Sequence, residues 1–219
     1  MRSCISVRII LFKLYFFLYN NVRYSFFVSK RRVTVEEKDE ALYSHFMLYG
    51  NNADLRILME RYRESLTLFL YGYTQNMEDA EEVMLDAFAQ AVSGTSHFKG
   101  NSSFKTWLFA IGRNLALKRL RKPRLSVVPL SDETYHPLTE NPDSAVLSAE
   151  KDEMLYLAIE KLPSDYRQVL YLLYFEELTP EEISKVMKKS RTQIYKLASR
   201  GRAALRKKLE ESGWESGEI

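Results

Sequence analysis

The chain has 219 residues, 46% of them hydrophobic and 28% charged, which is the balance of a folded protein and excludes a disordered one. It has only one cysteine, Cys4, so a disulfide framework and a cysteine-based zinc site are excluded, and its 3 histidines show no metal-ligand spacing. The 8 glycines and 6 prolines are few for this length, which favours long helices with short connections over a many-stranded sheet. This cysteine usage makes a reducing cytoplasm the expected compartment.

The net charge of +3 conceals an uneven distribution of charge along the chain. Residues 1–32 contain seven basic residues and no acidic one, while five carboxylates and no base occupy residues 76–90. Eight basic residues without an acid follow at 99–124, seven acids and one base lie at 132–153, and ten basic residues without an acid lie at 185–208. Two basic segments separated by acidic ones favour two polyanion-binding surfaces, with solvated helix faces as the alternative.

An apolar, aromatic stretch lies at residues 9–19, close to the start of the chain. Its longest run without a charge covers nine residues, 14–22, whereas a membrane-spanning helix needs about 20. No small-residue cleavage site follows, so a signal peptide is not indicated. Three interpretations of residues 1–35 remain: sequence translated in error from a start codon placed too early, a disordered or partner-binding extension, or a membrane anchor.

Residues 36–122 have the apolar periodicity of helices. One predicted helix has an apolar face formed by Leu55, Leu58, Met59, Tyr62, Leu66, Phe69 and Leu70. Asn76 is the expected cap of a second helix, whose first turn is acidic, as the helix dipole favours. After a polar loop at 93–103, a third helix is expected over 103–121, and Pro123 ends it.

Residues 123–148 contain four of the 6 prolines and show neither a helical nor a strand period, which predicts a flexible linker. Helical periodicity returns over 149–212, and residues 213–219 are expected to form a tail. The predicted fold class is therefore all-α, with two small helical domains joined by the linker.

The most specific motif is a helix-turn-helix pattern at residues 178–209. Thr179 is a good N-cap for its first helix, and Pro180 suits the first helical position. Glu182 follows the cap by three residues, as in a capping box. Ser190 is the expected cap of the second helix.

The two helices of this motif are expected to pack through four apolar residues, which are Ile183, Met187, Ile194 and Leu197. Such packing would hold the second helix on the surface, ready to enter a DNA major groove. Arginine, glutamine and serine side chains can contact base edges, and cations can neutralise phosphates. The expected DNA-binding residues of this helix are Arg191, Thr192, Gln193, Tyr195, Lys196, Ser199 and Arg200.

Three segments resemble the bacterial sigma factors of the sigma-70 family, in particular the small two-domain members of the extracytoplasmic-function (ECF) group. Residues 76–91 are similar to the acidic helix that such factors present to RNA polymerase. Residues 98–122 are similar to the helix that opens and reads the downstream (−10) promoter element, and the helix-turn-helix is similar to the part that reads the upstream (−35) element. The resemblance covers residues 40–210, and it implies a region 2-like domain at 36–122 and a region 4-like domain at 149–212.

The resemblance assigns roles to individual residues at matching positions. Asp79, Glu82 and Asp86 match the acidic contacts to the β′ clamp helices of the polymerase core, and their spacing puts them on one helix face. The loop 99–103 matches a loop that captures a flipped-out base. Contacts with the downstream element are expected at Lys105, Trp107, Arg113, Asn114 and Lys118, with core packing as the alternative role of Trp107.

The implied partners are the RNA polymerase core, promoter DNA and an anti-sigma factor, with no cofactor, metal or small-molecule substrate. The implied location is the cytoplasm, with association with the nucleoid through polymerase and recruitment to the membrane when an anti-sigma factor holds the protein. No nucleophile–base pair or phosphate loop points to an enzyme. The alternative function is a two-domain helix-turn-helix transcriptional regulator without a polymerase role. The chain departs from the family pattern at Lys188 and Lys189, where a glycine and an apolar residue are usual, and at Ser184.

Overall fold

The computed structural model of the chain describes residues 38–93, 97–121, 154–155 and 157–213. These ranges contain helices and no strand, so the predicted all-α fold class is confirmed. The predicted N-terminal extension and linker lie outside the described residues. Within the described ranges, none of the helices combines the length and the apolar character that crossing a membrane requires.

The first helical group consists of α2 (Asp39–Tyr49), α3 (Asn52–Thr74), α4 (Met77–Val92) and α5 (Phe104–Arg121). The long helix α3 packs against the other three, because its apolar face is wide enough to contact all of them. The side chain of Asn76 accepts a hydrogen bond from the backbone N–H of Asp79 at 2.9 Å, so the predicted cap of α4 is confirmed.

The second helical group consists of α7 (Ser164–Tyr174), α8 (Pro180–Met187) and α9 (Arg191–Glu211), preceded by helical residues at 154–155 and 157–160. Helix α9 packs against both α7 and α8. Helices α8 and α9 begin directly after Thr179 and Ser190, so both predicted caps are confirmed. Pro163 separates the helical residues before it from α7, as its fixed backbone angle favours at a helix start.

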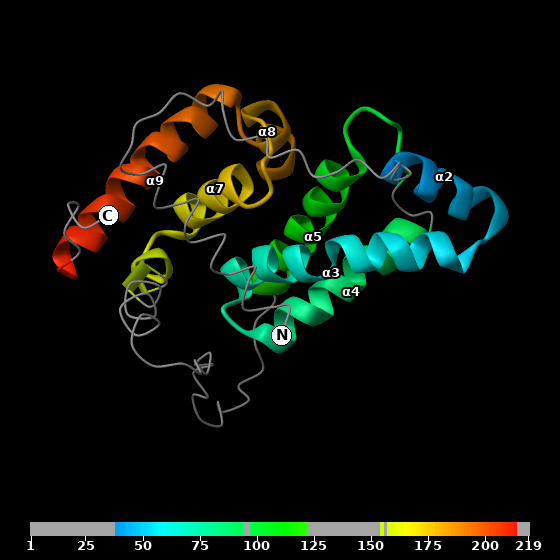
Figure 1. The fold of residues 1–219 in the computed structure, drawn as a ribbon, viewed down its shortest axis with the longest axis horizontal. Coiled ribbons are helices and arrows are strands. Elements are labelled where there is room, and N and C mark those ends of the chain that lie inside the picture. The colour runs from blue at the N-terminus through cyan, green and yellow to red at the C-terminus, as the bar shows by residue number, and fades with distance from the viewer. Residues whose placement is uncertain (1–37, 94–96, 122–153, 156, 214–219) are drawn as a thin grey trace, which may run out of the picture.

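The two helical groups pack directly against each other, which the sequence did not predict. Helix α3 contacts α7, and α5 contacts α8, so the buried apolar residues of both groups form one continuous core. Figure 1 shows α7 and α8 beside α3 and α5, with α2 and α9 at opposite ends of the molecule. Gly72 permits a close approach of α3 to α7, since a Cβ there would lie 2.1 Å from Nε2 of the buried Gln168.

Aromatic residues dominate the contact between α3 and α7. The ring centroids of Phe69 and Tyr171 lie 6.0 Å apart, and the Tyr171 hydroxyl donates a hydrogen bond of 2.8 Å to the carbonyl of Ser65. Burial raises the pKa of Tyr171 well above its ordinary value, so the hydroxyl stays protonated and remains a donor. The contact therefore combines apolar burial with a directed hydrogen bond between the groups.

Candidate nucleic-acid interface

Helices α8 and α9 form the predicted helix-turn-helix. Both begin with a capping box, in which the cap side chain and the residue three positions later each bond the other's backbone N–H. Ile183, Met187 and Ile194 are fully buried, and they hold the two helices together. The turn passes through Lys188, whose φ of 52° lies in the left-handed region. Glycine is the usual residue at such a helix end because it adopts this conformation without strain. Lysine takes the same backbone shape here at a cost in strain.

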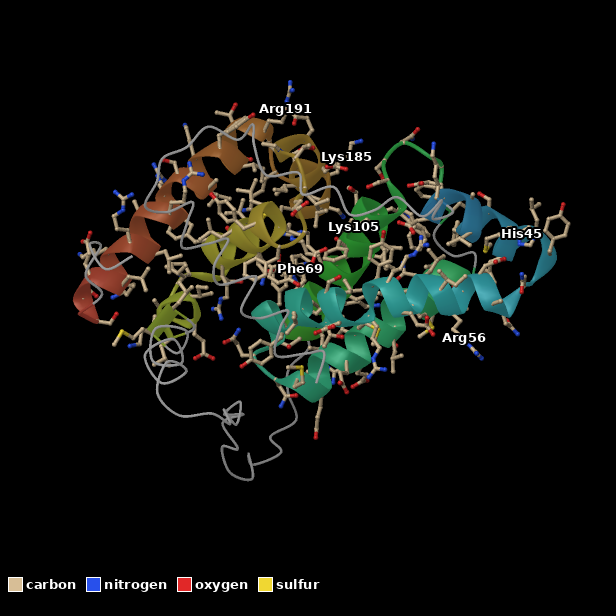
Figure 2. All side chains as sticks on the ribbon, viewed as in Figure 1. His45, Arg56, Phe69, Lys105, Lys185 and Arg191 are labelled. Carbon is tan, nitrogen blue, oxygen red and sulfur yellow. The ribbon has the colours of Figure 1, made fainter. Side chains whose placement is uncertain are left out.

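The outer face of α9 presents most of the expected DNA-binding residues to solvent. Five of them are exposed and lie on successive turns of the helix, namely Thr192, Tyr195, Lys196, Ser199 and Arg200. Arg191 is also exposed and lies 3.0 Å from the carboxylate of Glu181 on α8, which lowers the pKa of that carboxyl through a side-chain hydrogen bond. Figure 2 shows Arg191 pointing away from the body of the molecule.

Gln193 differs from its neighbours because its side chain already has a structural partner. Its Oε1 atom accepts a hydrogen bond of 2.8 Å from the backbone N–H of Ser190 and completes the capping box of α9. Its amide nitrogen is left for other contacts, so a base could receive a hydrogen bond only from Nε2 while the cap persists.

On α5, the expected promoter contact Lys105 lies in an ion pair between the two helical groups. Its Nζ atom lies 2.6 Å from a carboxylate oxygen of Glu176 and donates a second bond of 2.9 Å to the Glu176 carbonyl. The Glu176 side chain is 6% exposed and the Lys105 side chain 25%, so water reaches the pair only from the lysine side. In this arrangement the Nζ atom of Lys105 is therefore already bound to an acidic partner.

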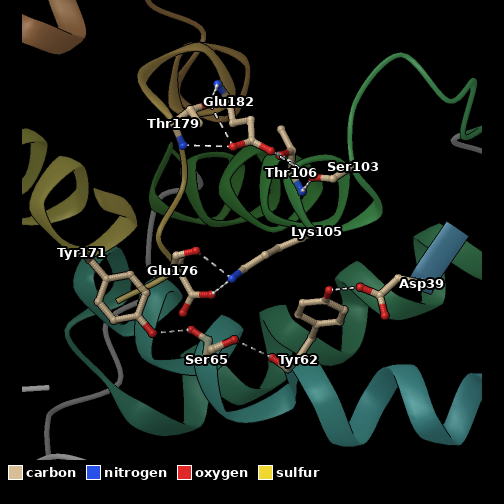
Figure 3. Close-up of polar contacts among 10 residues, drawn as sticks. All are labelled: Asp39, Tyr62, Ser65, Ser103, Lys105, Thr106, Tyr171, Glu176, Thr179 and Glu182. Carbon is tan, nitrogen blue, oxygen red and sulfur yellow. Dashed lines mark hydrogen bonds and ion pairs between the residues drawn. The ribbon is translucent and has the colours of Figure 1, made fainter. Parts of the chain in front are cut away.

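The second helical group also contacts the loop before α5 and the first turn of α5, as Figure 3 shows for Ser103 and Thr106. A carboxylate oxygen of Glu182 on α8 accepts hydrogen bonds of 3.4 Å from the hydroxyls of both residues. Lys185, also on α8, donates a bond of 2.6 Å to the carbonyl of Asn101. Helix α8 therefore contacts the loop to which the sequence assigns capture of a flipped-out base.

Trp107 lies in an aromatic cluster of the first helical group. Its ring centroid is 5.3 Å from that of Tyr43 and 5.2 Å from that of Phe98, and both contacts are tilted or edge-on. These contacts favour the alternative role of Trp107, which is packing. Phe104 joins the same cluster and is fully buried.

The remaining expected promoter residues of α5 lie further along the helix. Asn114 and Lys118 are exposed, while Arg113 is partly buried and its Nε donates a hydrogen bond of 3.1 Å to the Tyr73 hydroxyl. Burial raises the pKa of Tyr73 to about 12, so the hydroxyl is neutral at physiological pH. The bond to Tyr73 fixes the direction in which the guanidinium of Arg113 lies.

The acidic face of α4 carries Asp79, Glu82 and Asp86, the expected polymerase contacts. Arg119 of α5 lies 2.5 Å from the carboxylate of Asp79 and 2.7 Å from that of Glu82. Its guanidinium lowers the pKa of Glu82, first through the hydrogen bond and then through its charge. Asp86 is exposed, and no ion pair among the described residues includes it.

Sequence reasoning missed Glu176, Glu182 and Arg119 as partners of the site residues. Each joins elements that are far apart in the chain, so no local pattern could reveal the pairing. Only the basic character of α5 and the acidic character of α4 hinted that Arg119 would find carboxylates.

Comparison with known proteins assigns the family. Residues 58–125 match the family model for sigma-70 region 2, and residues 152–205 match the model for sigma-70, region 4. The chain is 30% identical over 164 residues to the ECF RNA polymerase sigma factor SigW of Bacillus subtilis, an alignment that covers 70% of this chain and 88% of that protein. The chain belongs to the ECF sigma factors. It is also 30% identical over 148 residues to the ECF RNA polymerase sigma-E factor of Escherichia coli strain K12, covering 63% of this chain and 77% of that one.

Solved structures show the same fold as this ECF sigma factor. The sigma factor RpoE of Bartonella quintana, in complex with the anti-sigma factor NepR, gives a TM-score of 0.57 at 20% identity, covering 72% of this chain and 97% of that chain. CnrH in complex with the cytosolic domain of CnrY gives 0.55 at 21% identity, covering 79% and 97%. The helix-turn-helix thus belongs to sigma region 4, and α3–α5 belong to region 2.

Proposed function

We propose that this ECF sigma factor directs RNA polymerase to promoters through three surfaces, which are α4 for the polymerase core, α5 for the downstream element and α9 for the upstream element. The observation that carries the proposal is the rigid presentation of α9, whose exposed polar and basic face stands on a turn held by two capping boxes. Binding energy at these surfaces drives initiation, and the protein performs no catalysis of its own.

At the upstream element, α9 enters the major groove. Arg200 and Ser199 are positioned to reach base edges, and Lys196 is positioned to neutralise phosphate. Tyr195 is 58% exposed, and in the groove its aromatic ring would contact base methyl groups or sugars. Release of counterions from the phosphates makes this binding weaken steeply as salt rises.

At the downstream element, the loop 99–103 and the first turn of α5 accept an unstacked base. Unstacking costs free energy, which contacts from Lys105, Asn114 and Lys118 to the opened strand would offset. In the described arrangement Lys105 is bound to Glu176, and helix α8 covers the loop. We therefore propose that the two helical groups separate when the protein joins the polymerase core.

At the polymerase core, Asp86 is the freest of the three acidic residues of α4 and makes the first contact with basic side chains of the enzyme. Asp79 and Glu82 are held by Arg119, which orients both carboxylates along one face of the helix. Such a fixed acidic row favours specificity and fast association more than affinity.

The solved structure of RpoE contains the anti-sigma factor NepR, and that of CnrH contains the cytosolic domain of CnrY. We propose a partner of the same kind here, which would hold α3–α5 and α7–α9 together and block both promoter-reading surfaces. This partner and the polymerase would meet the protein in the cytoplasm.

Transcription with purified core polymerase tests the proposal. The protein should give a promoter-specific start on DNA from its own genome, and Asp86→Lys should reduce the yield about tenfold, because it reverses a charge at the core contact. Glu81→Lys, a matched reversal on a neighbouring exposed position of α4, should change the yield less than twofold. Promoter binding by the protein alone with no effect on polymerase would instead favour the helix-turn-helix regulator.

A further inference from the structure

A cavity of about 390 Å³, half open to solvent, lies between α5 and the turn that joins α8 to α9. Its lining residues are Arg113, Asn114, Leu117, Lys118, Arg121, Met187, Lys188 and Lys189. The cavity is therefore built from both helical groups and exists only while they are packed together. Its volume lies in the range of small-molecule sites.

The cavity is lined by five cations, three from α5 and two from the turn. Lys189 lies 3.0 Å from the carboxylate of Asp165 on α7, and Arg113 bonds the neutral Tyr73 hydroxyl. No ion pair among the described residues includes Lys118, Arg121 or Lys188. Asp165 offsets the charge of Lys189, and the carboxyl ends of α5 and α8 add partial negative charges, but the four remaining cations exceed these partial charges. An anion that enters the cavity would relieve this repulsion.

The backbone of Lys188 supplies a second, independent observation. Its φ of 52° is a left-handed conformation that glycine adopts without strain and that lysine adopts at a cost in free energy. Glycine would keep the turn and remove that cost, so the fold itself gives no reason for a lysine. Strained residues of this kind cluster at binding sites, and the side chain of Lys188 lines the cavity.

We infer that this cavity binds a small oligophosphate, an anion with two or three adjacent phosphate groups. The guanidinium groups of Arg113 and Arg121 suit bidentate contacts with phosphate oxygens, and the lysines act as point charges around them. Leu117 and Met187 form an apolar wall that suits an organic group attached to the phosphates. A single phosphate would leave most of the four cations that have no carboxylate neighbour among the described residues without an anionic partner.

The ligand has a direct consequence for the arrangement of the two helical groups. Its cationic partners come from α5 on one side and from the turn after α8 on the other. It therefore binds the packed arrangement more tightly than a separated one, and by linkage it holds the two groups together. Oligophosphate and promoter DNA would then compete.

Isothermal titration calorimetry of the full chain with sodium tripolyphosphate, at constant ionic strength, tests the inference. One equivalent should bind saturably, and Lys188→Gly should weaken binding about tenfold while thermal unfolding shows a protein at least as stable as the wild type. Lys207→Gln removes a charge from α9 outside the cavity and should change the affinity less than twofold. The readout needs no polymerase, so it is independent of the proposed function.

Three outcomes would overturn the inference. The first is heat that does not saturate with tripolyphosphate. The second is an equal loss of affinity in Lys188→Gly and Lys207→Gln, which would indicate attraction to the overall basic surface. The third comes from a parallel titration with a short single-stranded oligonucleotide: if the oligonucleotide alone binds, and Lys188→Gly weakens it, the cavity is a contact for the DNA backbone.

Discussion

Among the residues of α9, Gln193 has two possible roles that use different atoms. Its Oε1 closes the capping box with Ser190, and its Nε2 is available to a base. Glutamate at this position would keep the box, because either side chain serves in that motif, but it would lose the donor and bring a negative charge to the DNA. A substitution by glutamate can therefore separate the capping role of Gln193 from its role in DNA binding.

We predict that Gln193→Ala lowers the free energy of unfolding by about 0.5–1 kcal/mol, since half of the capping box is lost. Gln193→Glu should leave stability within about 0.5 kcal/mol of the wild type, yet both variants should bind upstream promoter DNA more weakly. Chemical denaturation and gel-shift titration measure the two effects. Thr192→Ala, which removes no cap, is the stability control, and wild-type DNA binding by Gln193→Glu would show that Gln193 only caps α9.

Among the helices, α4 and α5 are joined by ion pairs of Arg119 on α5. Its guanidinium contacts Asp79 and Glu82 together, and the pKa of the Glu82 carboxyl is lowered by this contact. A carboxyl whose pKa is lower in the folded than in the unfolded protein stabilises the fold above its unfolded pKa. That contribution disappears as the pH falls through the folded pKa.

Arg119→Gln should therefore be less stable than the wild type at pH 7, and the difference should narrow as the pH falls below 4.5, the ordinary value for glutamate. Urea denaturation across this pH range provides the measurement. Lys118→Gln, on the same helix and outside every ion pair of the described residues, should show no such pH dependence. If the difference in free energy of unfolding between Arg119→Gln and the wild type stayed constant with pH, Arg119 would stabilise the contact of α4 with α5 by packing and not by charge.

The sequence predicted those elements whose signals are local. Asn76, Thr179 and Ser190 act on backbone N–H groups within three residues, so each helix start could be located from neighbouring residues alone. The contact of Lys105 with Glu176 joins residues 71 positions apart and depends on how two helical groups pack. The predicted linker carries no pattern that fixes this packing. Hence the helix starts could be predicted from the sequence, but the packing of the two helical groups against each other could not.

In the whole molecule, the packed arrangement covers residues that we propose take part in promoter reading. Glu176, Glu182 and Lys185 of the second group all contact the loop or first turn of α5. Contact through a charged hydrogen bond contributes about 1–3 kcal/mol, so loss of one such contact shifts an equilibrium between packed and separated forms by about 5–150-fold. Contacts of this size are consistent with our proposal that the two groups are packed in the free protein and separate on the polymerase.

Förster resonance energy transfer between a dye on the loop 99–103 and a dye on α8 measures whether the two helical groups separate. Dyes are attached in a Cys4→Ser background at Asn101→Cys and Glu181→Cys, both exposed positions. Glu176→Gln should lower the transfer efficiency of the free protein, whereas Glu81→Gln, an exposed position on α4, should not. The efficiency should be high in the free wild-type protein and should fall when core polymerase is added. An unchanged high efficiency in a transcriptionally active complex would contradict the account.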